Sequence, residues 1–413
     1  MTITVKNMYD PTADIAVSLA AAKAVDAARI VRSTATASMF LNDDPNQLRL
    51  VIDGFVIPEV KSATLLLSVD CAADGFTAVI PYHDALAPLR DSFLSPPGYP
   101  VAEVYLGGKK RFTGKLYQRK CKFGHTGKYR TLIGWSPIAD AIDSVVTPPY
   151  QTDMMTLTAH ATRLLAPFGL VVKWMAGADL PFTRIKCERE EKIGENLFRL
   201  ARERGVFVMS DPDGNVVFHQ PSATIPVAMF TEGLPPFDEA EIDIDGRKWF
   251  GQSVCFGTHP RGNKQATAVD DRFPIGRRTV VHAPEGSDAD MKTSAEWAAR
   301  KQFGEGIEFS QTVPSWYTSA LPGADIWLPN TLVRVTSPTM FLPTGFDFLT
   351  RSVEIQWDGT GVARAVLDFV SPTAYLTLLA QKTNALSWKA RMMLQKAVAS
   401  PFEQICMDEP GDI

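Results

Sequence analysis

The histidines and serines that could carry out chemistry are scattered along the 413-residue chain. The six histidines form no HExxH motif and no pair four residues apart, and none lies near a cysteine at zinc-ligand spacing. They are His83, His125, His160, His219, His259 and His282. No serine lies in a GxSxG elbow, and Gly-rich phosphate loops are absent. The sequence therefore predicts no catalytic, cofactor-binding or metal-binding residue, and no enzyme activity.

Three acid clusters deserve comparison with glycoside hydrolases, which hold two carboxylates at a set separation. The clusters are Asp43-Asp44, Glu188 with Glu190-Glu191, and Asp270-Asp271. Because adjacent acids usually lie in solvated loops, we interpret these clusters as surface loops. A packing role is likewise expected for His160, which lies on a predicted helix four residues after Thr156.

A basic run is the best candidate for a charged patch. Its members are Lys109, Lys110, Arg111, Arg119, Lys120 and Lys122. On strands and hairpin tips, this run would form a subunit interface or a channel lining met by passing DNA. A solvated hairpin is the alternative interpretation.

Composition excludes several classes of protein. Hydrophobic residues make up 45% of the chain and charged residues 21%, which is typical of globular proteins. The net charge of −4 is too small to attract nucleic acid or anionic lipid strongly. Five separated cysteines without a CxxC indicate free thiols in a protein made in a reducing cytoplasm. The apolar run 15–30 contains three charged residues, which argues against membrane insertion and a signal peptide.

Alternating apolar and polar residues predict antiparallel strands in the first third of the chain. The predicted strands are 48–55, 62–70, 76–80, 102–106, 111–117, 118–123 and 129–134. Gly107-Gly108 is a strong hairpin signal, since both central residues of a type I′ turn need positive φ. A short helix at 136–144 should follow, with Ser136 as its N-cap and Pro137 at its first position.

The rest of the chain alternates between helical and strand patterns. Two short helices, at about 155–166 and 194–205, should pack on a hairpin that turns at 211–214. Strand-like segments resume at 243–256, 325–328, 332–335, 348–357 and 361–369, and one helix is predicted at 291–304.

These elements predict an α+β fold of two antiparallel β domains that flank a small α+β domain, with helical extensions at both ends. The predicted boundaries are 1–42 for the N-terminal helical extension, 43–150 for the first β domain, 151–235 for the small domain, 236–375 for the second β domain and 376–413 for the C-terminal helical tail.

A series of short motifs in this order resembles the Mu-like baseplate hub family of contractile phage tails. The motifs include Gly54-Phe55, Asp74-Gly75-Phe76, Phe112-Thr113-Gly114, Gly134-Trp135-Ser136, Asp140, Asp143-Ser144, Pro167-Phe168-Gly169, 193–205, Asp213-Gly214, 247–251, 297–300 and 368–375. Each motif alone is a turn, a cap or a strand end. Their order over about 320 residues makes the resemblance specific. The family also includes late-control proteins and is distantly similar to type VI secretion spike hubs.

The resemblance implies that the two β domains, 43–150 and 236–375, are tube-like antiparallel β-barrel domains that flank the small α+β domain. It also implies a homotrimer, so that three chains with two barrels each form a pseudo-sixfold ring. One side of this ring would meet the tail tube protein and the other the central spike protein. Tape-measure and other baseplate proteins are further expected partners, DNA would pass transiently through the lumen, and no cofactor is implied. The ring would belong to the virion tail and assemble in the host cytoplasm.

Two alternatives remain open at this point. One is a tail-associated cell-wall hydrolase, which zymography on peptidoglycan would reveal. The other is the hub of a phage-derived bacteriocin or of a type VI secretion spike, which neighbouring genes would distinguish.

Overall fold

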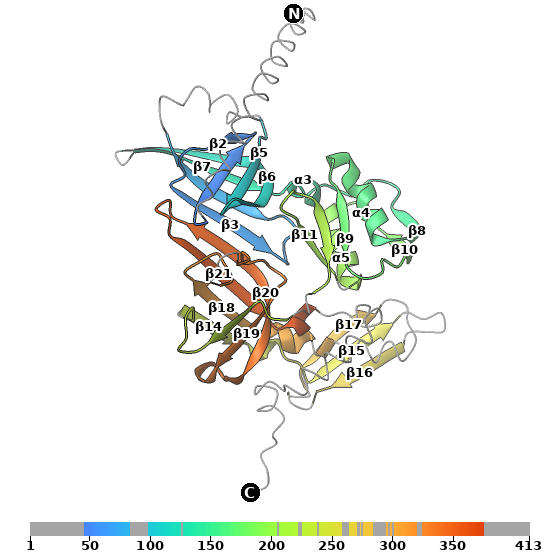
Figure 1. Cartoon of the computed structure of the whole chain (residues 1–413). Helices are drawn as coiled ribbons and strands as arrows, with labels where there is room; N and C mark the ends of the chain where they lie inside the picture. Colours follow the sequence, from blue (N-terminus) through green and yellow to red (C-terminus); the bar gives the residue numbers. More distant parts are fainter. Residues whose placement is uncertain are drawn as a thin grey trace, which may run out of the picture.

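The computed structural model describes residues 45–375, except for a set of internal segments (Figure 1). The exceptions are 83–97, 125–126, 205, 222–224, 238, 258–263, 271–272, 274–275, 284–294, 296–297, 300 and 320–323. The predicted helical extensions, 1–42 and 376–413, lie outside the described residues.

A 13-stranded, mainly antiparallel sheet dominates the molecule, in the order β14-β18-β21-β20-β3-β4-β7-β6-β5-β1-β2, with β19 on β20 and β13 on β19. Its N-terminal strands are β1 Leu48–Ile52, β2 Phe55–Val56, β3 Ser62–Ser68, β4 Gly75–Pro81, β5 Val101–Leu106, β6 Lys109–Gly124 and β7 Gly127–Trp135. Its later strands are β13 Ala228–Thr231, β14 Glu239–Ile244, β18 Ile307–Val313, β19 Leu332–Ser337, β20 Leu342–Trp357 and β21 Ala363–Val370. Strand alternation in the sequence therefore predicted most of this sheet.

The Gly107-Gly108 turn is confirmed. Gly107 has a φ of 52° and Gly108 a φ of 75°, and Leu106 pairs with Lys109 across the two-residue loop. The segments predicted as strands 111–117 and 118–123 form one continuous strand, β6, which pairs with β5 over its first half and with β7 over the rest. A register shift between Leu116 and Gln118 marks the change of partner.

The two halves of the sheet meet at β3 and β20. Leu65 pairs with Ile355 in this antiparallel joint, and both side chains are buried. One continuous apolar core underlies both halves and includes Phe112, Phe309 and Phe348. The strands of the large sheet join in one continuous sheet, and the described part of the chain is mostly antiparallel β with few helices, in agreement with the α+β class. The division into two tube-like barrels stays a prediction.

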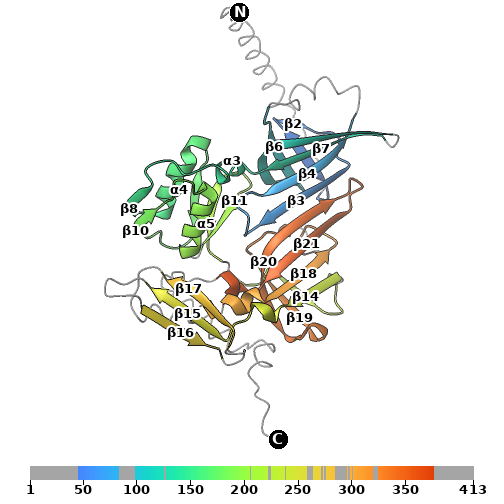
Figure 2. The ribbon, with the colours of Figure 1, turned by 180° about the vertical axis from the view of Figure 1, so that it is seen from behind.

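A small α+β unit lies beside the upper half of the sheet (Figures 1 and 2). Its helices are α3 Ala139–Ile142, α4 Leu157–Leu165 and α5 Ile193–Arg204, and its strands are β8 Gln151–Met155, β9 Val172–Met175, β10 Phe182–Lys186, β11 Phe207–Ser210 and β12 Val216–His219. The Thr156 side chain accepts a hydrogen bond from the Ala159 N–H at 3.2 Å, which caps α4. The two predicted helices and the predicted hairpin are confirmed.

The structure corrects the expected N-cap at Ser136. The short helix α3 begins at Ala139, without a side-chain cap. Ser136 is buried, and its hydroxyl accepts a hydrogen bond from the Ser210 hydroxyl at 2.9 Å. Its side chain therefore connects the small unit to the sheet, which a local capping pattern does not reveal.

A separate three-stranded sheet, which the sequence pattern did not distinguish from the second β domain, interrupts the later half. It consists of β15 Gln252–Gly257, β16 Lys264–Val269 and β17 Arg278–Ala283. Of the predicted helix 291–304, all the residues that the structure describes, 295, 298–299 and 301–304, are helical. The predicted strand at 325–328 is wrong, since Ile326 makes one isolated bridge to Tyr317.

Short 3₁₀ helices complete the described part of the fold. The first, η2 Ala166–Phe168, ends α4. The others are η3 Gly246–Lys248, η4 Pro338–Met340 and η5 Pro372–Tyr375.

Candidate interaction surfaces

The most chemically suggestive cluster surrounds His160 in the core of the small unit. His160 is fully buried, and its Nε2 lies 2.8 Å from Oδ1 of the buried Asn196. Asn196 in turn donates to Cys187 Sγ at 3.2 Å and to Glu191 at 3.1 Å. Burial lowers the pKa of His160 despite the Asn196 contact. His160 Nδ1 is buried without a hydrogen-bond partner in the described part of the chain. The contacts of Asn196 thus form a core packing network around one face of the His160 ring.

The described members of the Glu188–Glu191 cluster lie on the surface or in a structural ion pair. Glu191 pairs with Arg199 at 2.9 Å and supports the core network, whereas Glu188 and Glu190 are exposed. Asp43, Asp44 and Asp271 lie outside the described residues. Among the described residues, no group of three or more His, Cys, Asp or Glu side chains could hold a metal ion.

The predicted basic patch separates into two groups at opposite ends of β6. Lys109, Lys110 and Arg111 follow the turn, whereas Arg119, Lys120 and Lys122 lie on its outer half. At about 3.3 Å per residue, Lys109 and Lys122 are roughly 40 Å apart along the strand. The six residues therefore do not make one patch.

In the first group, Lys110 connects β6 to the small unit. Lys110 Nζ forms an ion pair of 2.5 Å with Asp213 of the small unit, and the pKa of Lys110 is raised by this contact although partial burial opposes it. Burial lowers the pKa of Arg111, whereas the nearby Asp325 and Tyr317 act in the opposite direction. Lys109 is exposed.

The second group lies on a projecting hairpin, which we call the arm and define as residues 119–124 and 127–130. Figures 1 and 2 show the arm extending from the upper half of the sheet. Arg119 donates to the Gly98 carbonyl, but Lys120 and Lys122 are exposed and have no acidic partner among the described residues. The Phe123 side chain is 83% exposed.

Aromatic rings beneath the arm are covered by cations. Lys128 Nζ lies 5.3 Å from the centre of the Tyr82 ring, and the Arg130 guanidinium lies 4.7 Å from the same ring. These residues and their neighbours line a hollow of about 310 Å³. The arm is thus a basic and aromatic surface on a hairpin that β6 and β7 make stiff.

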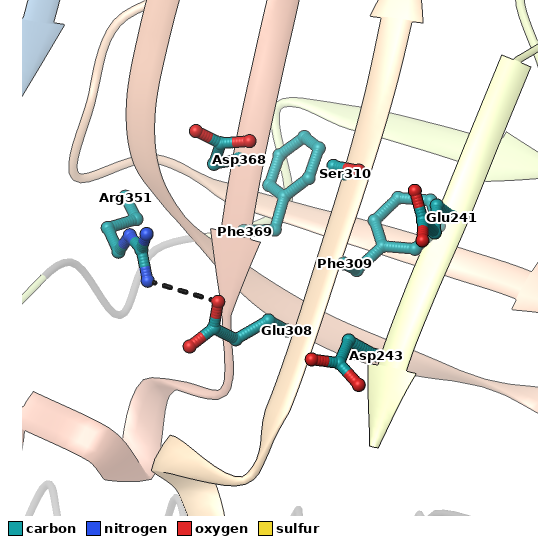
Figure 3. Close-up of a pocket in the computed structure, with 8 residues that line it drawn as sticks. All are labelled: Glu241, Asp243, Glu308, Phe309, Ser310, Arg351, Asp368 and Phe369. Atoms are coloured by element: carbon teal, nitrogen blue, oxygen red, sulfur yellow. Dashed lines mark ion pairs between the residues drawn. The ribbon is translucent and has the colours of Figure 1, made fainter. Parts of the chain in front are cut away.

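An acidic surface lies near the opposite end of the sheet, and the sequence reading did not identify it. Figure 3 shows Glu241 and Asp243 of β14, Glu308 of β18 and Asp368 of β21, which we call the acidic face. They line a shallow pocket of about 180 Å³. The alternation of acids at 239, 241 and 243 was the available signal.

The acidic face is only partly neutralised. Glu308 pairs with Lys248 at 2.8 Å and with Arg351 at 3.4 Å, and these cations hold its pKa below the usual value although partial burial acts in the other direction. Asp243 lies directly opposite Glu308 in the strand register. Among the described residues, no cation lies within 4.0 Å of Glu241 or Asp243.

Several residues of the sequence motifs form joints between parts of the molecule. Asp140 binds Lys115 Nζ and the Tyr117 hydroxyl, both at 2.6 Å. The Tyr375 hydroxyl donates to Asp70 at 2.9 Å. These contacts join segments that are separated in the sequence.

The described helices include none that is long and apolar enough to cross a membrane. The cysteines of the described part, Cys71, Cys121, Cys187 and Cys255, are free thiols.

The fold is similar to that of two solved phage tail proteins. A 43 kDa tail protein of prophage MuSo2 from Shewanella oneidensis is 24% identical, with a TM-score of 0.67 over 79% of this chain and 99% of that one. A tail protein from Neisseria meningitidis MC58 is 16% identical, with a TM-score of 0.68 over 79% of this chain and 97% of that one. At these identities, the similarity concerns the fold.

Sequence comparison finds similarity to baseplate hub proteins. Residues 139–220 match the family model for the second domain of gp44-like baseplate hub proteins. The chain is 24% identical over 258 residues to the baseplate hub protein gp44 of Escherichia phage Mu. That alignment spans 58% of this chain and 66% of the Mu protein, just under two thirds of its length. The predicted resemblance to Mu-like baseplate hub proteins is confirmed.

Proposed function

We propose that this chain is a structural subunit of a contractile phage tail hub, in which three copies form a pseudo-sixfold ring between the tail tube and the central spike. The observation that supports this most is the joint between β3 and β20. It places two β regions side by side in one chain with a continuous sheet. Three such chains supply six units, which suits a sixfold tube on one side and a threefold spike on the other.

The physics of strand edges also favours a ring. An unpaired edge strand invites uncontrolled association, and a ring of head-to-tail contacts closes such edges. Among the described residues, β14 pairs on one side with β18, and β2 pairs on one side with β1. The two ends of the sheet path are therefore surfaces that neighbouring copies would cover.

In this proposal the chain acts by binding, and its partners are the tube protein, the spike protein, and tape-measure and other baseplate proteins. DNA passes transiently through the lumen, no part inserts into a membrane, and the virion tail is the site of function after assembly in the host cytoplasm. The domain boundaries at 42, 150, 235 and 375 describe the units that build this ring.

Native mass spectrometry of the purified full chain tests the oligomeric state, and an axial image of assembled tails tests the ring. A mass of three chains and a pseudo-sixfold ring are expected. A monomer at micromolar concentration, together with no trimer in assembled tails, would contradict the proposal. Zymography on peptidoglycan should show no clearing, and clearing would favour the hydrolase instead.

A further inference from the structure

The arm and the acidic face lie on the same side of the large sheet. Residues paired across antiparallel strands share a face, and so do residues two apart on one strand. Glu241 pairs with Ser310, Ser310 with Asp368, and Asp368 with Ser352. The same side continues through β3 and β4 to Tyr129, which pairs with Lys122 of the arm. One face therefore carries a partly neutralised group of acids near one end and exposed lysines near the other.

The two surfaces cannot neutralise each other within one chain. Five strands separate β14 from β7. At about 4.8 Å per step, six steps correspond to roughly 29 Å, and the arm extends further along its own strands. Figures 1 and 2 show β14 in the lower half of the molecule and the arm in the upper half.

Each surface carries features of an incomplete contact. On the arm, Lys120 and Lys122 lie on this face, whereas the 83% exposed Phe123 ring lies on the other face of β6, 6.0 Å from Lys128 Nζ. On β14, the strand has a partner on one side only within the described part of the chain. Lys248 and Arg351 pair with Glu308, whereas Glu241 and Asp243 have no ion-pair partner among the described residues, so a cation from outside could pair with them.

We propose that the arm of one copy docks against the acidic face of a neighbouring copy. This inference rests on the proposed ring and assigns residues to its contact between subunits. Lys120 and Lys122 would face Glu241 and Asp243 across this contact. Because the arm and the acidic face lie at different ends of the sheet, the contact is head to tail, the type that closes into a ring.

Charge reversal in the full chain tests the contact. Lys120→Glu/Lys122→Glu and Glu241→Lys/Asp243→Lys should each raise the trimer dissociation constant about tenfold or more, because like charges would then meet. The variant with all four changes should recover most of the wild-type affinity. Mass photometry measures the association, and circular dichroism checks that each variant is folded.

A trimer that is equally stable in all four proteins would overturn the arm contact while leaving the proposed ring intact. A wild-type chain that never forms trimers would overturn the ring and the arm contact together. Weakening by the single-surface variants without recovery in the combined variant would show that the two surfaces do not meet, and would also overturn the inference.

Crosslinking and DNA binding supply independent readouts. In a chain whose exposed Cys71 and Cys121 are replaced by serine, Lys122→Cys together with Asp243→Cys should give disulfide-linked dimers and trimers on oxidation, whereas each of these cysteines alone should not. Absence of crosslinks in a trimeric sample would contradict the contact. Fluorescence anisotropy with an oligonucleotide tests the other class of partner: binding lost with Lys120→Glu/Lys122→Glu, while trimers persist, would assign the arm to nucleic acid and overturn the proposal.

Discussion

Replacing both glycines of the β5–β6 turn by valine should destabilise the first β region. Gly107 and Gly108 have φ values of 52° and 75°, in the left-handed region. Side chains with a Cβ pay about 1 to 2 kcal/mol per residue there, and branching at Cβ adds to this. A Cβ on Gly107 would also lie 2.8 Å from the Pro45 carbonyl oxygen. We therefore expect Gly107→Val/Gly108→Val to lower the free energy of unfolding by about 3 kcal/mol or more.

Urea denaturation followed by circular dichroism measures this loss, and Gly124→Val is the matched control. Gly124 lies in a different hairpin, that of β6 and β7. Its φ is not positive, and a Cβ there would meet nothing within 4 Å. The control should therefore change stability by less than about 0.5 kcal/mol. A double variant as stable as this control would refute the assignment of backbone strain to the turn.

Three further outcomes are expected. Leu65→Ala and Ile355→Ala, which each remove a buried side chain from the joint of the sheet, should cost about 2 to 5 kcal/mol each by urea titration, and a loss below about 1 kcal/mol would show that the joint is not tightly packed. Burial raises the pKa of Asp74 well above its usual value, so the folded chain binds that proton more tightly than the unfolded chain. The resulting stability should be present below the ordinary Asp pKa and be lost as pH rises toward the raised value; Asp74→Asn should flatten this dependence, and an unchanged pH profile would contradict it. Asn196→Ala should cost about 1 to 3 kcal/mol in thermal or urea unfolding because it leaves buried His160 without its partner, and an unchanged midpoint would show that the contact is dispensable.

The local features of this chain were predictable because they depend on neighbours in the sequence. Alternation predicted most strands of the large sheet, and the positive φ that a two-residue turn needs identified Gly107-Gly108. The Thr156 cap and the two helices of the small unit follow from the same short-range chemistry. The order of these motifs was enough to indicate the resemblance to baseplate hubs.

The arrangement of charges and joints required the tertiary structure. Lys110 and Lys122 belong to one basic run in the sequence, yet a single long strand carries them to opposite ends, where one pairs with Asp213 and the other lies on the arm. Ser136 fits a helix cap locally, but burial against Ser210 gives its hydroxyl another partner. The acidic face likewise combines strands that lie far apart in the chain. Local patterns determine turns, caps and strands because their energies come from adjacent residues, whereas strand pairing across hundreds of residues decides which charges share a surface.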